Sequence, residues 1–338
     1  MENTGKKSEG QGLLHIVYGD VTLGVHGSGN KGAFHYIFSY TAGGMESLVS
    51  GGIEWLYRPP RPCFWRALTD NDRGNGFALN SGMWFAADQF IRCGEITIAV
   101  DGEKIPFPSA PRNNIYTGQE TAEEIAITYI YETITVPAAL VEVCYQIGKN
   151  GEIQVKVCYH GVKGLPELPV FGMRFLMPTC ADGFKYEGLS GETYPDRKAG
   201  GVFGIYEVEG LPVTPYLVPQ DCGMHMDTVW VEVRRSRTLD NRIRSDKAAS
   251  LRFQAKEGGS FAFSCLPYSA SELENAFHQE ELPPPRRTVL GIYGAVRGVG
   301  GIDSWGSDVE PHCRIDAEKD ISYRFSIVPC GGGLEGQS

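Results

Sequence analysis

Apolar and polar residues alternate with a period of two along much of the chain. The alternation is clearest in residues 123–136 (EEIAITYIYETITV), 139–147 (ALVEVCYQI) and 152–160 (EIQVKVCYH). β-Branched and aromatic residues occupy the apolar positions, which is typical of strands with one buried face. The sequence GKNG at residues 148–151 joins the last two segments and predicts a hairpin turn. The pattern therefore predicts antiparallel strands.

The same alternation continues from residue 14 to residue 329 and predicts an all-β fold. Glycine occurs 43 times and proline 20 times, and they separate the apolar segments at short intervals, as turns of an antiparallel protein require. We expect a large antiparallel β-sandwich, built of two extensive sheets packed face to face. The further strand segments are 14–27, 34–40, 227–235, 250–256, 260–268, 288–300 and 321–329.

Helical patterns are few. In SASELENAFHQEEL (269–282), Ser271 is expected to cap a helix because Glu274 follows three residues later, and the prolines at 283–285 would end it. A second helix is expected in residues 80–93. No repeat or polar linker divides the chain, so we expect one domain over residues 13–330, with disordered tails at 1–12 and 331–338.

Composition excludes several classes of function. The net charge of −10 argues against nucleic-acid binding, which needs a basic face. The mixed-charge run at residues 234–247 is expected to be a solvated hairpin. No apolar run reaches the ~18–20 residues of a membrane helix, and the start of the chain lacks the apolar core of a secretion signal. Nine scattered cysteines without a CxxC pair indicate a reduced chain, without disulfides or zinc. We expect a cytoplasmic protein.

One glycine-rich segment, RGVGGIDSWGSDVE (297–310), leads into Asp303 and Trp305. It is no phosphate-binding loop, because neither a lysine nor a helix follows the glycines. Two interpretations remain from the residues alone. The glycines could form a tight turn that places Trp305 in the core. Alternatively, the turn presents Trp305 to a sugar, whose C–H faces stack on indole while Asp303 accepts hydrogen bonds.

Three other segments concentrate polar residues: 62–77, 186–200 and 214–231. In residues 62–77, the sequence Asp-Asn-Asp at 70–72 resembles the start of a calcium loop, but the glycine and glutamate of that pattern are missing, so we expect local turn hydrogen bonds. Gly74 and Gly76 would then form a flexible connection. In residues 186–200 we expect an ion-paired corner, formed by Glu192, Asp196 and Arg197.

The residues reveal no catalytic machinery by themselves. His225, in residues 214–231, lacks a second histidine at ligand spacing and is expected to be structural. A glycosidase needs two carboxylates across the scissile bond, and sequence alone cannot pair the 41 acidic residues. Neither a GxSxG elbow nor an HExxH helix occurs.

Five motifs nevertheless occur in an informative order over roughly residues 13–330. Together they resemble the C-terminal β-sandwich of the glycoside hydrolase family 2 β-galactosidases. The resemblance is closest to the separate small chain of the heterodimeric enzymes of lactic acid bacteria and their relatives. The motifs are FWRALTDNDRG, YEGLSGETYPDR, TPYLVPQDCG, LPYSASELENAFHQEELP and GVGGIDSW.

The resemblance implies a galactose-mutarotase-like supersandwich. It also implies that both catalytic glutamates, the Mg²⁺ ligands and most sugar-binding groups lie on a large subunit, and that this chain binds no cofactor. Trp305 corresponds to the tryptophan of the family's GGxDSW motif, which lines the active-site entrance, and Asp303 belongs to the same motif. Gly74 and Asn75 correspond to a mobile loop near that site, where this sequence departs from the single-chain enzymes.

The function implied is that of a β-galactosidase small subunit. The assembled enzyme would hydrolyse terminal β-D-galactosides such as lactose, and this chain would be inactive without its large partner. Two alternatives stay open. One is a non-catalytic carbohydrate-binding protein. The other is a mutarotase-like sugar epimerase, for which His160, His225 and Glu192 are the candidate residues.

Overall fold

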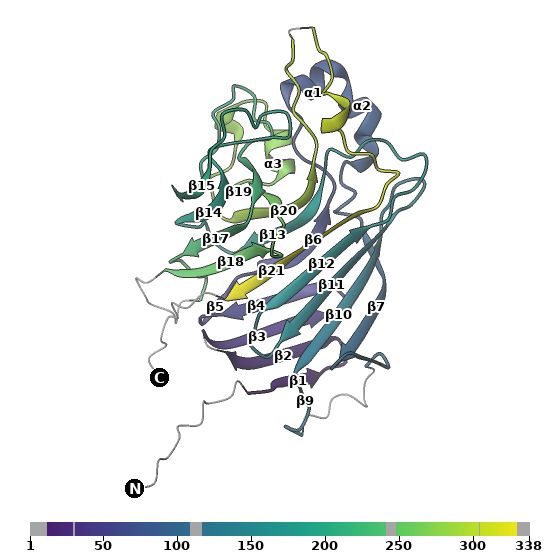
Figure 1. The fold of residues 1–338 in the computed structure, drawn as a ribbon, viewed down its shortest axis with the longest axis vertical. Helices are drawn as coiled ribbons and strands as arrows, with labels where there is room; N and C mark the ends of the chain where they lie inside the picture. The colour runs from purple at the N-terminus through teal and green to yellow at the C-terminus, as the bar shows by residue number, and fades with distance from the viewer. Residues whose placement is uncertain (1–11, 30, 109–116, 241–247, 304, 330–338) are drawn as a thin grey trace.

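A computed structural model describes residues 12–29, 31–108, 117–240, 248–303 and 305–329. Every strand pair is antiparallel, so the all-β prediction is confirmed (Figure 1). The tails expected at 1–12 and 331–338 lie outside the described residues, apart from Gly12. None of the helices in the described part of the chain has the length and hydropathy that a membrane crossing requires.

The strands form three sheets. The six-stranded sheet has the order β5 (Ile53–Glu54), β4 (Gly44–Ser50), β3 (Gly32–Ser39), β2 (Thr22–Gly29), β1 (Leu14–Tyr18) and β9 (Thr121–Ala122). The five-stranded sheet has the order β16 (Met224–Thr228), β19 (Phe261–Leu266), β20 (Thr288–Val296), β13 (Val170–Met177) and β6 (Arg58–Cys63). The ten-stranded sheet has the order β15 (Phe203–Glu209), β14 (Gly183–Leu189), β17 (Trp230–Arg235), β18 (Ala249–Ala255), β21 (Ile321–Pro329), β12 (Ile153–Tyr159), β11 (Leu140–Gly148), β10 (Glu124–Glu132), β7 (Arg92–Val100) and β8 (Glu103–Ile105).

The alternation seen in the sequence becomes the core face of the ten-stranded sheet. On β10, every second residue from Ile125 to Tyr131 is fully buried, and β11 and β12 follow the same pattern. The predicted hairpin at 148–151 joins β11 to β12, with Ile147 paired to Ile153. Because side chains alternate across a strand, this register directs one apolar row inward from each strand.

The two smaller sheets pack on different parts of the ten-stranded sheet. Phe38 of β3 lies with its ring centroid 5.6 Å from that of Tyr145 on β11. Phe175 of β13 lies 5.0 Å from Phe253 on β18, measured in the same way. The expectation of two sheets is therefore wrong in one respect: the second layer is divided into two. Strand twist accumulates over ten strands, so two separately twisted sheets cover the large sheet where one could not.

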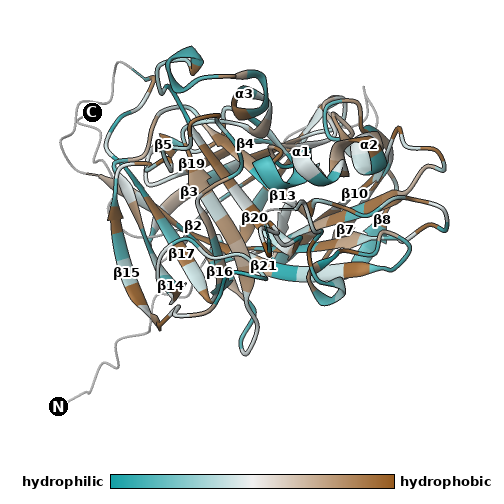
Figure 2. Ribbon diagram, turned by 90° about the horizontal axis from the view of Figure 1, so that it is seen from above, coloured by the Kyte–Doolittle hydropathy of each residue, from teal (hydrophilic) through white to brown (hydrophobic). Residues whose placement is uncertain are grey.

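The hydropathy pattern agrees with this layering. Viewed from above, brown hydrophobic segments lie mainly in the strands, whereas α1 is mostly teal (Figure 2). Strand β15, at the edge of the ten-stranded sheet, is an exception, because Phe203 and Ile205 are exposed on it. The eight cysteines in the described residues are all free thiols.

Within the residues that the structure describes, three short α-helices and three 3₁₀ turns connect the strands. They are α1 (Asp70–Asn75), α2 (Phe77–Ser81), η1 (Gly82–Trp84), α3 (Ala270–Asn275), η2 (Gln279–Glu281) and η3 (Pro311–Cys313). The local hydrogen bonds expected of the Asp-Asn-Asp sequence at 70–72 form at the start of a helix: Thr69 and Asp72 make a capping box that starts α1, and Gly76 ends it with φ of +76°. The helix expected at 80–93 is wrong, since Ala86 has φ of +59° and strand β7 begins at Arg92.

The cap of α3 lies two residues before the predicted one. Ser269 accepts a hydrogen bond from the Glu272 amide at 3.3 Å, and the Glu272 carboxylate accepts from the Ser269 amide at 2.7 Å. Ser271 and Glu274 have the same spacing as this pair. Glu274, however, accepts instead from the Leu68 amide at 2.7 Å. A tertiary contact therefore decides between two equivalent capping patterns.

The charged run at 234–247 is only partly a solvated hairpin. It connects the paired strands β17 and β18, as expected, but Arg235 is fully buried, and residues 241–247 lie outside the described residues. Arg235 donates to the Glu54 carbonyl and the Thr179 hydroxyl, both at 3.0 Å, and covers the Trp55 ring. Burial lowers the pKa of Arg235 to about 10.

The β13–β20 pairing supplies a test of the fold. At Gly172, a Cβ atom would lie 2.5 Å from the Ile292 carbonyl oxygen and 2.8 Å from the Tyr293 Cα. We expect Gly172→Ala to lower the free energy of unfolding by about 1–3 kcal/mol, because backbone must move to admit the methyl group. Chemical denaturation measures this. Gly94→Ala is the control, since its nearest neighbour would lie at 3.9 Å. Equal stability of the two variants would contradict this pairing.

Candidate functional site

A pocket of about 420 Å³ lies where four of the five motifs meet, and Asp70 and Asn71 of α1 line it. The remaining motif, LPYSASELENAFHQEELP, is attached to the first motif by the hydrogen bond from the Leu68 amide to Glu274. Carboxylates, amides, hydroxyls and one guanidinium face this space, which suits a ligand rich in hydroxyl groups. The lining residues are Thr69, Asp70, Asn71, Glu192, Tyr194, Arg197, Tyr216, Gln220, Asp221, Val299 and Gly300.

A buried ion network supports one wall of the pocket. Asp72, which is 1% exposed, lies between Arg66 at 2.7 Å and Arg297 at 3.4 Å, and these arginines are 3% and 0% exposed. Arg66 also donates to the Gly298 carbonyl at 3.1 Å. Arg297 reaches Asp308 as well, at the far end of the glycine-rich segment. A central carboxylate therefore joins α1 to both ends of that segment.

The glycines of residues 298–301 form a tight turn that neighbouring side chains hold in place. Asp196 accepts hydrogen bonds from the amides of Val299 at 3.0 Å and Gly300 at 2.8 Å. Gly300 and Gly301 have φ of +73° and +76°, where a side chain would be strained. A Cβ atom on Gly298 would lie 2.8 Å from the Asp196 carboxyl group. The chain can approach this carboxylate only because glycine stands there.

The ion-paired corner expected from Glu192, Asp196 and Arg197 is wrong. Both carboxylates accept hydrogen bonds from the backbone instead, and Glu192 does so from the Gly223 amide at 2.9 Å. Arg197 donates to the carbonyls of Asp196 and Gly300. Turn backbone has many unsatisfied N–H and C=O groups, and these compete successfully with ion pairing on the surface.

Trp305 lies on the segment that follows the turn and is 91% exposed. The core interpretation is therefore wrong for this residue. Asp303 fixes the local backbone, since it accepts from the Trp305 amide at 2.9 Å and from the Ser307 amide at 3.2 Å. Hydrogen bonds from Ser307 and from the Trp305 amide lower the pKa of Asp303. The carboxylate organises the turn that presents the indole.

Gly74 and Asn75 lie against the same segment. The Asn75 side chain donates to Asp308 at 3.1 Å, and a Cβ atom on Gly306 would lie 3.5 Å from the Gly74 carbonyl oxygen. The structure thus brings together the four residues predicted for the sugar site, Gly74, Asn75, Asp303 and Trp305. Their contact with a sugar, and the mobility expected of residues 74 and 75, stay predictions.

Asp221 is the most perturbed carboxyl group in the pocket. It accepts a hydrogen bond from the buried Tyr194 hydroxyl at 2.8 Å. Burial raises the pKa of Asp221 to about 6, although the nearby Arg66 opposes the shift. A carboxyl group that titrates near neutral pH is common at functional sites.

Comparison with known proteins identifies the family. Residues 29–327 match the family described as "Beta galactosidase small chain". The chain belongs to this family. It is 60% identical to the β-galactosidase small subunit of Latilactobacillus sakei, over 97% of this chain and 99% of that one. It is 34% identical to β-galactosidase BgaC of Bifidobacterium adolescentis, over 91% of this chain but only 27% of that relative.

Solved structures of similar outline include a galactose mutarotase-like protein from Lactobacillus casei, with 8% identity and a TM-score of 0.38, which covers 93% of this chain and 99% of that one. A putative aldose 1-epimerase from Escherichia coli has 10% identity and a TM-score of 0.40, and covers 93% of this chain and 97% of that one.

The three candidate epimerase residues of this small chain have separate partners. His160 lies 4.0 Å from Asp320. The buried His225 ring stacks on Phe263, with 4.7 Å between centroids, and burial lowers its pKa to about 4. Glu192 accepts hydrogen bonds from Thr214 and Gly223. No hydrogen bond or ion pair joins any two of these three described side chains, and His225 is structural, as expected.

Sequence reasoning missed several residues that build the site. Arg66, Gln220 and Asp221 lie inside the quoted motifs, but their local sequence gives no sign that they line or support a pocket. Gln220 exchanges two hydrogen bonds of 3.0 Å with Asp70 across 150 positions, which no local pattern reveals. The described residues contain no group of three or more His, Cys, Asp or Glu side chains placed to hold a metal ion.

The ion network predicts a large loss of stability in one variant. Asp72→Asn would leave Arg66 and Arg297 buried without their shared negative charge, and we expect the free energy of unfolding to fall by about 3–5 kcal/mol. Urea denaturation measures it. Glu132→Gln is the matched control, because its ion pair with Arg92 is exposed and contributes about 0–1 kcal/mol. A loss no larger than the control's would contradict the role of Asp72.

The raised pKa of Asp221 predicts a pH-dependent difference. Between its ordinary value and about 6, the folded chain retains a proton that the unfolded chain releases, so this group's contribution to stability falls as pH rises through that range. Asp221→Asn removes the effect. We expect the Tm of the variant, relative to the natural chain, to rise from pH 4 to pH 7. A constant difference in thermal unfolding across that range would contradict the assignment.

Proposed function

We propose that this chain is the small subunit of a β-galactosidase that hydrolyses terminal β-D-galactosides such as lactose. The L. sakei relative carries the name of such a subunit and matches this chain over 99% of its own length. The chain corresponds to only 27% of BgaC, and to 29% of a β-galactosidase from Halalkalibacterium halodurans. A partner subunit would supply the remaining part of the enzyme.

The proposed large subunit carries the chemistry. It would provide both catalytic glutamates, one as acid and base and the other as nucleophile, in a retaining double displacement. It would also hold the Mg²⁺, and the small chain would bind no cofactor. The share of length supports this division, because most of each longer relative lies outside the region that matches this chain.

The observation that supports a direct role for the small chain is the exposure of Trp305. An indole that is 91% exposed gives up the free energy of burial unless another molecule covers it. The Trp305 amide donates to Asp303, which holds the backbone turn that carries the ring. We propose that Trp305 borders the galactoside site where the two subunits meet, and stacks on the sugar or its leaving group.

The neighbouring residues have supporting roles in this proposal. Both carboxylate oxygens of Asp303 already accept hydrogen bonds from residues 305 and 307, so Asp303 would position the turn. Gly74 and Asn75 would adjust the same segment through Asp308. We also propose a cytoplasmic location, which the free thiols of the eight described cysteines support.

Substitution of Trp305 tests the proposal in the reconstituted enzyme. We expect Trp305→Ala to raise KM for a galactoside about 3–10-fold, because an aromatic stacking contact contributes about 0.5–1.5 kcal/mol. Subunit assembly should stay intact when measured by size-exclusion chromatography. Phe277→Ala, which removes an aromatic ring that is 72% exposed, is the control. Unchanged kinetics in Trp305→Ala would refute a role at the sugar site.

Activity assays with and without the partner separate this function from the alternatives. Galactoside hydrolysis only in the mixture of both subunits supports the proposal. Mutarotation by the isolated chain would favour an epimerase, and sugar binding without either activity would favour a carbohydrate-binding protein.

A further inference from the structure

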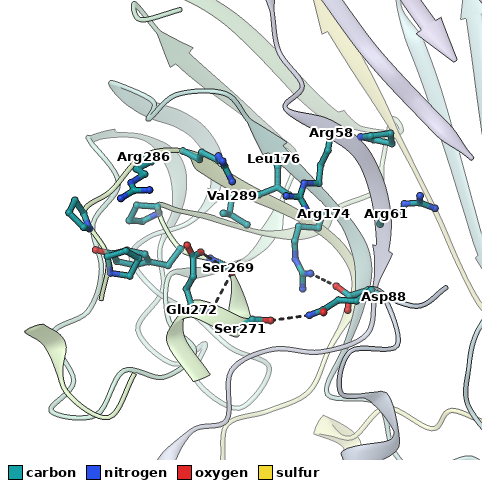
Figure 3. Close-up of a pocket in the computed structure, with 17 residues that line it drawn as sticks. Arg58, Arg61, Asp88, Arg174, Leu176, Ser269, Ser271, Glu272, Arg286 and Val289 are labelled. Carbon is teal, nitrogen blue, oxygen red and sulfur yellow. Dashed lines mark hydrogen bonds and ion pairs between the residues drawn. The ribbon is translucent and has the colours of Figure 1, made fainter. Parts of the chain in front are cut away.

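A second pocket, of about 660 Å³, lies over the outer face of the five-stranded sheet (Figure 3). Its floor comes from β6, β13 and β20, through Arg58, Arg174 and Val289. The segments 267–272 and 283–287 form another wall. None of the residues of the first pocket lines this one. The space is large enough for a ligand of sugar-phosphate size.

Arginine dominates the charge of this second pocket, although the whole chain has a net charge of −10. Five arginines line it, against two carboxylates. Those residues are Arg58, Arg61, Arg174, Arg286, Arg287, Asp88 and Glu272. An excess of cations in one cavity of an acidic protein is unfavourable unless an anion enters.

Some of these charges are already neutralised. Arg174 pairs with Asp88 and donates to the Trp65 carbonyl at 3.2 Å. Arg61 donates to the carbonyls of Ala42 and Gly43, and Figure 3 shows its guanidinium turned away from the other arginines. Glu272 belongs to the α3 capping box. The carboxylates of the pocket are therefore engaged with other groups.

Three arginines are left without a carboxylate partner in the described part of the chain: Arg58, Arg286 and Arg287. Arg287 lies 3.6 Å from the centroid of the Tyr57 ring, and Arg58 lies 5.7 Å from the same centroid. Two guanidinium groups thus lie within about 6 Å of one aromatic ring centroid. The three prolines at 283–285 precede Arg286 and restrict the backbone that presents it.

The opposite side of the pocket carries hydrogen-bonding groups, and the Glu272 carboxylate lies beside the serines there. The Ser269 hydroxyl is occupied, because it donates to Glu272 at 2.8 Å and accepts from the Glu272 amide. Figure 3 shows Arg58 and Arg286 above, with Ser269 and Ser271 below. Gln89 donates to the Ser271 hydroxyl at 3.3 Å and extends this polar side. Hydroxyl and amide groups bind the hydroxyls of a sugar, whereas planar guanidinium groups match the oxygens of a phosphate.

We propose that this pocket binds a small sugar phosphate, with the phosphate held by Arg58, Arg286 and Arg287 and the sugar facing Ser271 and Gln89. The site is separate from the galactoside site proposed above and does not depend on it. An acidic peptide of a partner protein could also neutralise arginines. It would not use the polar side formed by Ser271 and Gln89, which favours a compact polyol.

Isothermal titration calorimetry with the full chain tests the site, with glucose 6-phosphate as the probe. The comparison ligands are glucose, inorganic phosphate and a decamer of glutamate. We expect glucose 6-phosphate to bind at least about tenfold more tightly than either glucose or inorganic phosphate, because only it engages both sides. The affinity should also fall as salt increases.

A triple variant locates the binding. We expect Arg58→Gln/Arg286→Gln/Arg287→Gln to weaken glucose 6-phosphate binding at least tenfold. The control is Arg92→Gln/Lys149→Gln/Lys319→Gln, which removes the same charge from exposed ion pairs elsewhere. If the triple variant does not fold, as judged by circular dichroism, Arg286→Gln alone replaces it, since Arg286 is exposed. For that variant we expect at least a threefold loss.

Several results would overturn the proposal. They are the absence of binding at millimolar glucose 6-phosphate, equal affinity for inorganic phosphate, binding of the glutamate peptide alone, and equal losses in the pocket variant and the control variant. Tight binding that is lost only in the pocket variant would support it.

Discussion

The buried carboxylate of Asp72, held between Arg66 and Arg297, is the constraint on which the candidate site depends. Three charged groups, none more than 3% exposed, are tolerable only because each compensates the next. Their hydrogen bonds extend to α1, to the Gly298 carbonyl and to Asp308. The polar wall of the pocket is thereby attached to a mainly apolar core.

The turn at residues 298–301 and the exposed Trp305 depend on that attachment. Arg66 and Arg297 fix the start of the segment, Asp196 holds its amides, and Asp303 closes the turn that follows. Each contact is modest, but together they set the backbone before any ligand arrives. A site arranged in this way spends little binding energy on ordering itself.

The strands could be predicted because their information is local. Alternation in residues 123–160 fixed both the strands and their buried faces, and the GKNG turn fixed one pairing. The division of the second layer into two sheets could not be predicted, since it depends on twist summed over many strands. The predicted position of the α3 cap was wrong for a related reason: the hydrogen bond from the Leu68 amide to Glu274 joins residues 206 positions apart. The order of the motifs predicted the region of the site, but the hydrogen-bond partners of Asp196 and the burial of Arg235 could be known only from the folded structure.

The sequence separations in the ion network also constrain the order of folding. Asp72 and Arg297 are 225 positions apart, and Arg66 and Gly298 are 232 apart. During synthesis, Arg66 and Asp72 leave the ribosome long before β20 and the segment after it exist. They stay hydrated until that late part of the chain arrives, because burying them earlier would leave their charges only partly compensated. The site is thus among the last regions to form, because it needs the segments near residues 70 and 300 to meet.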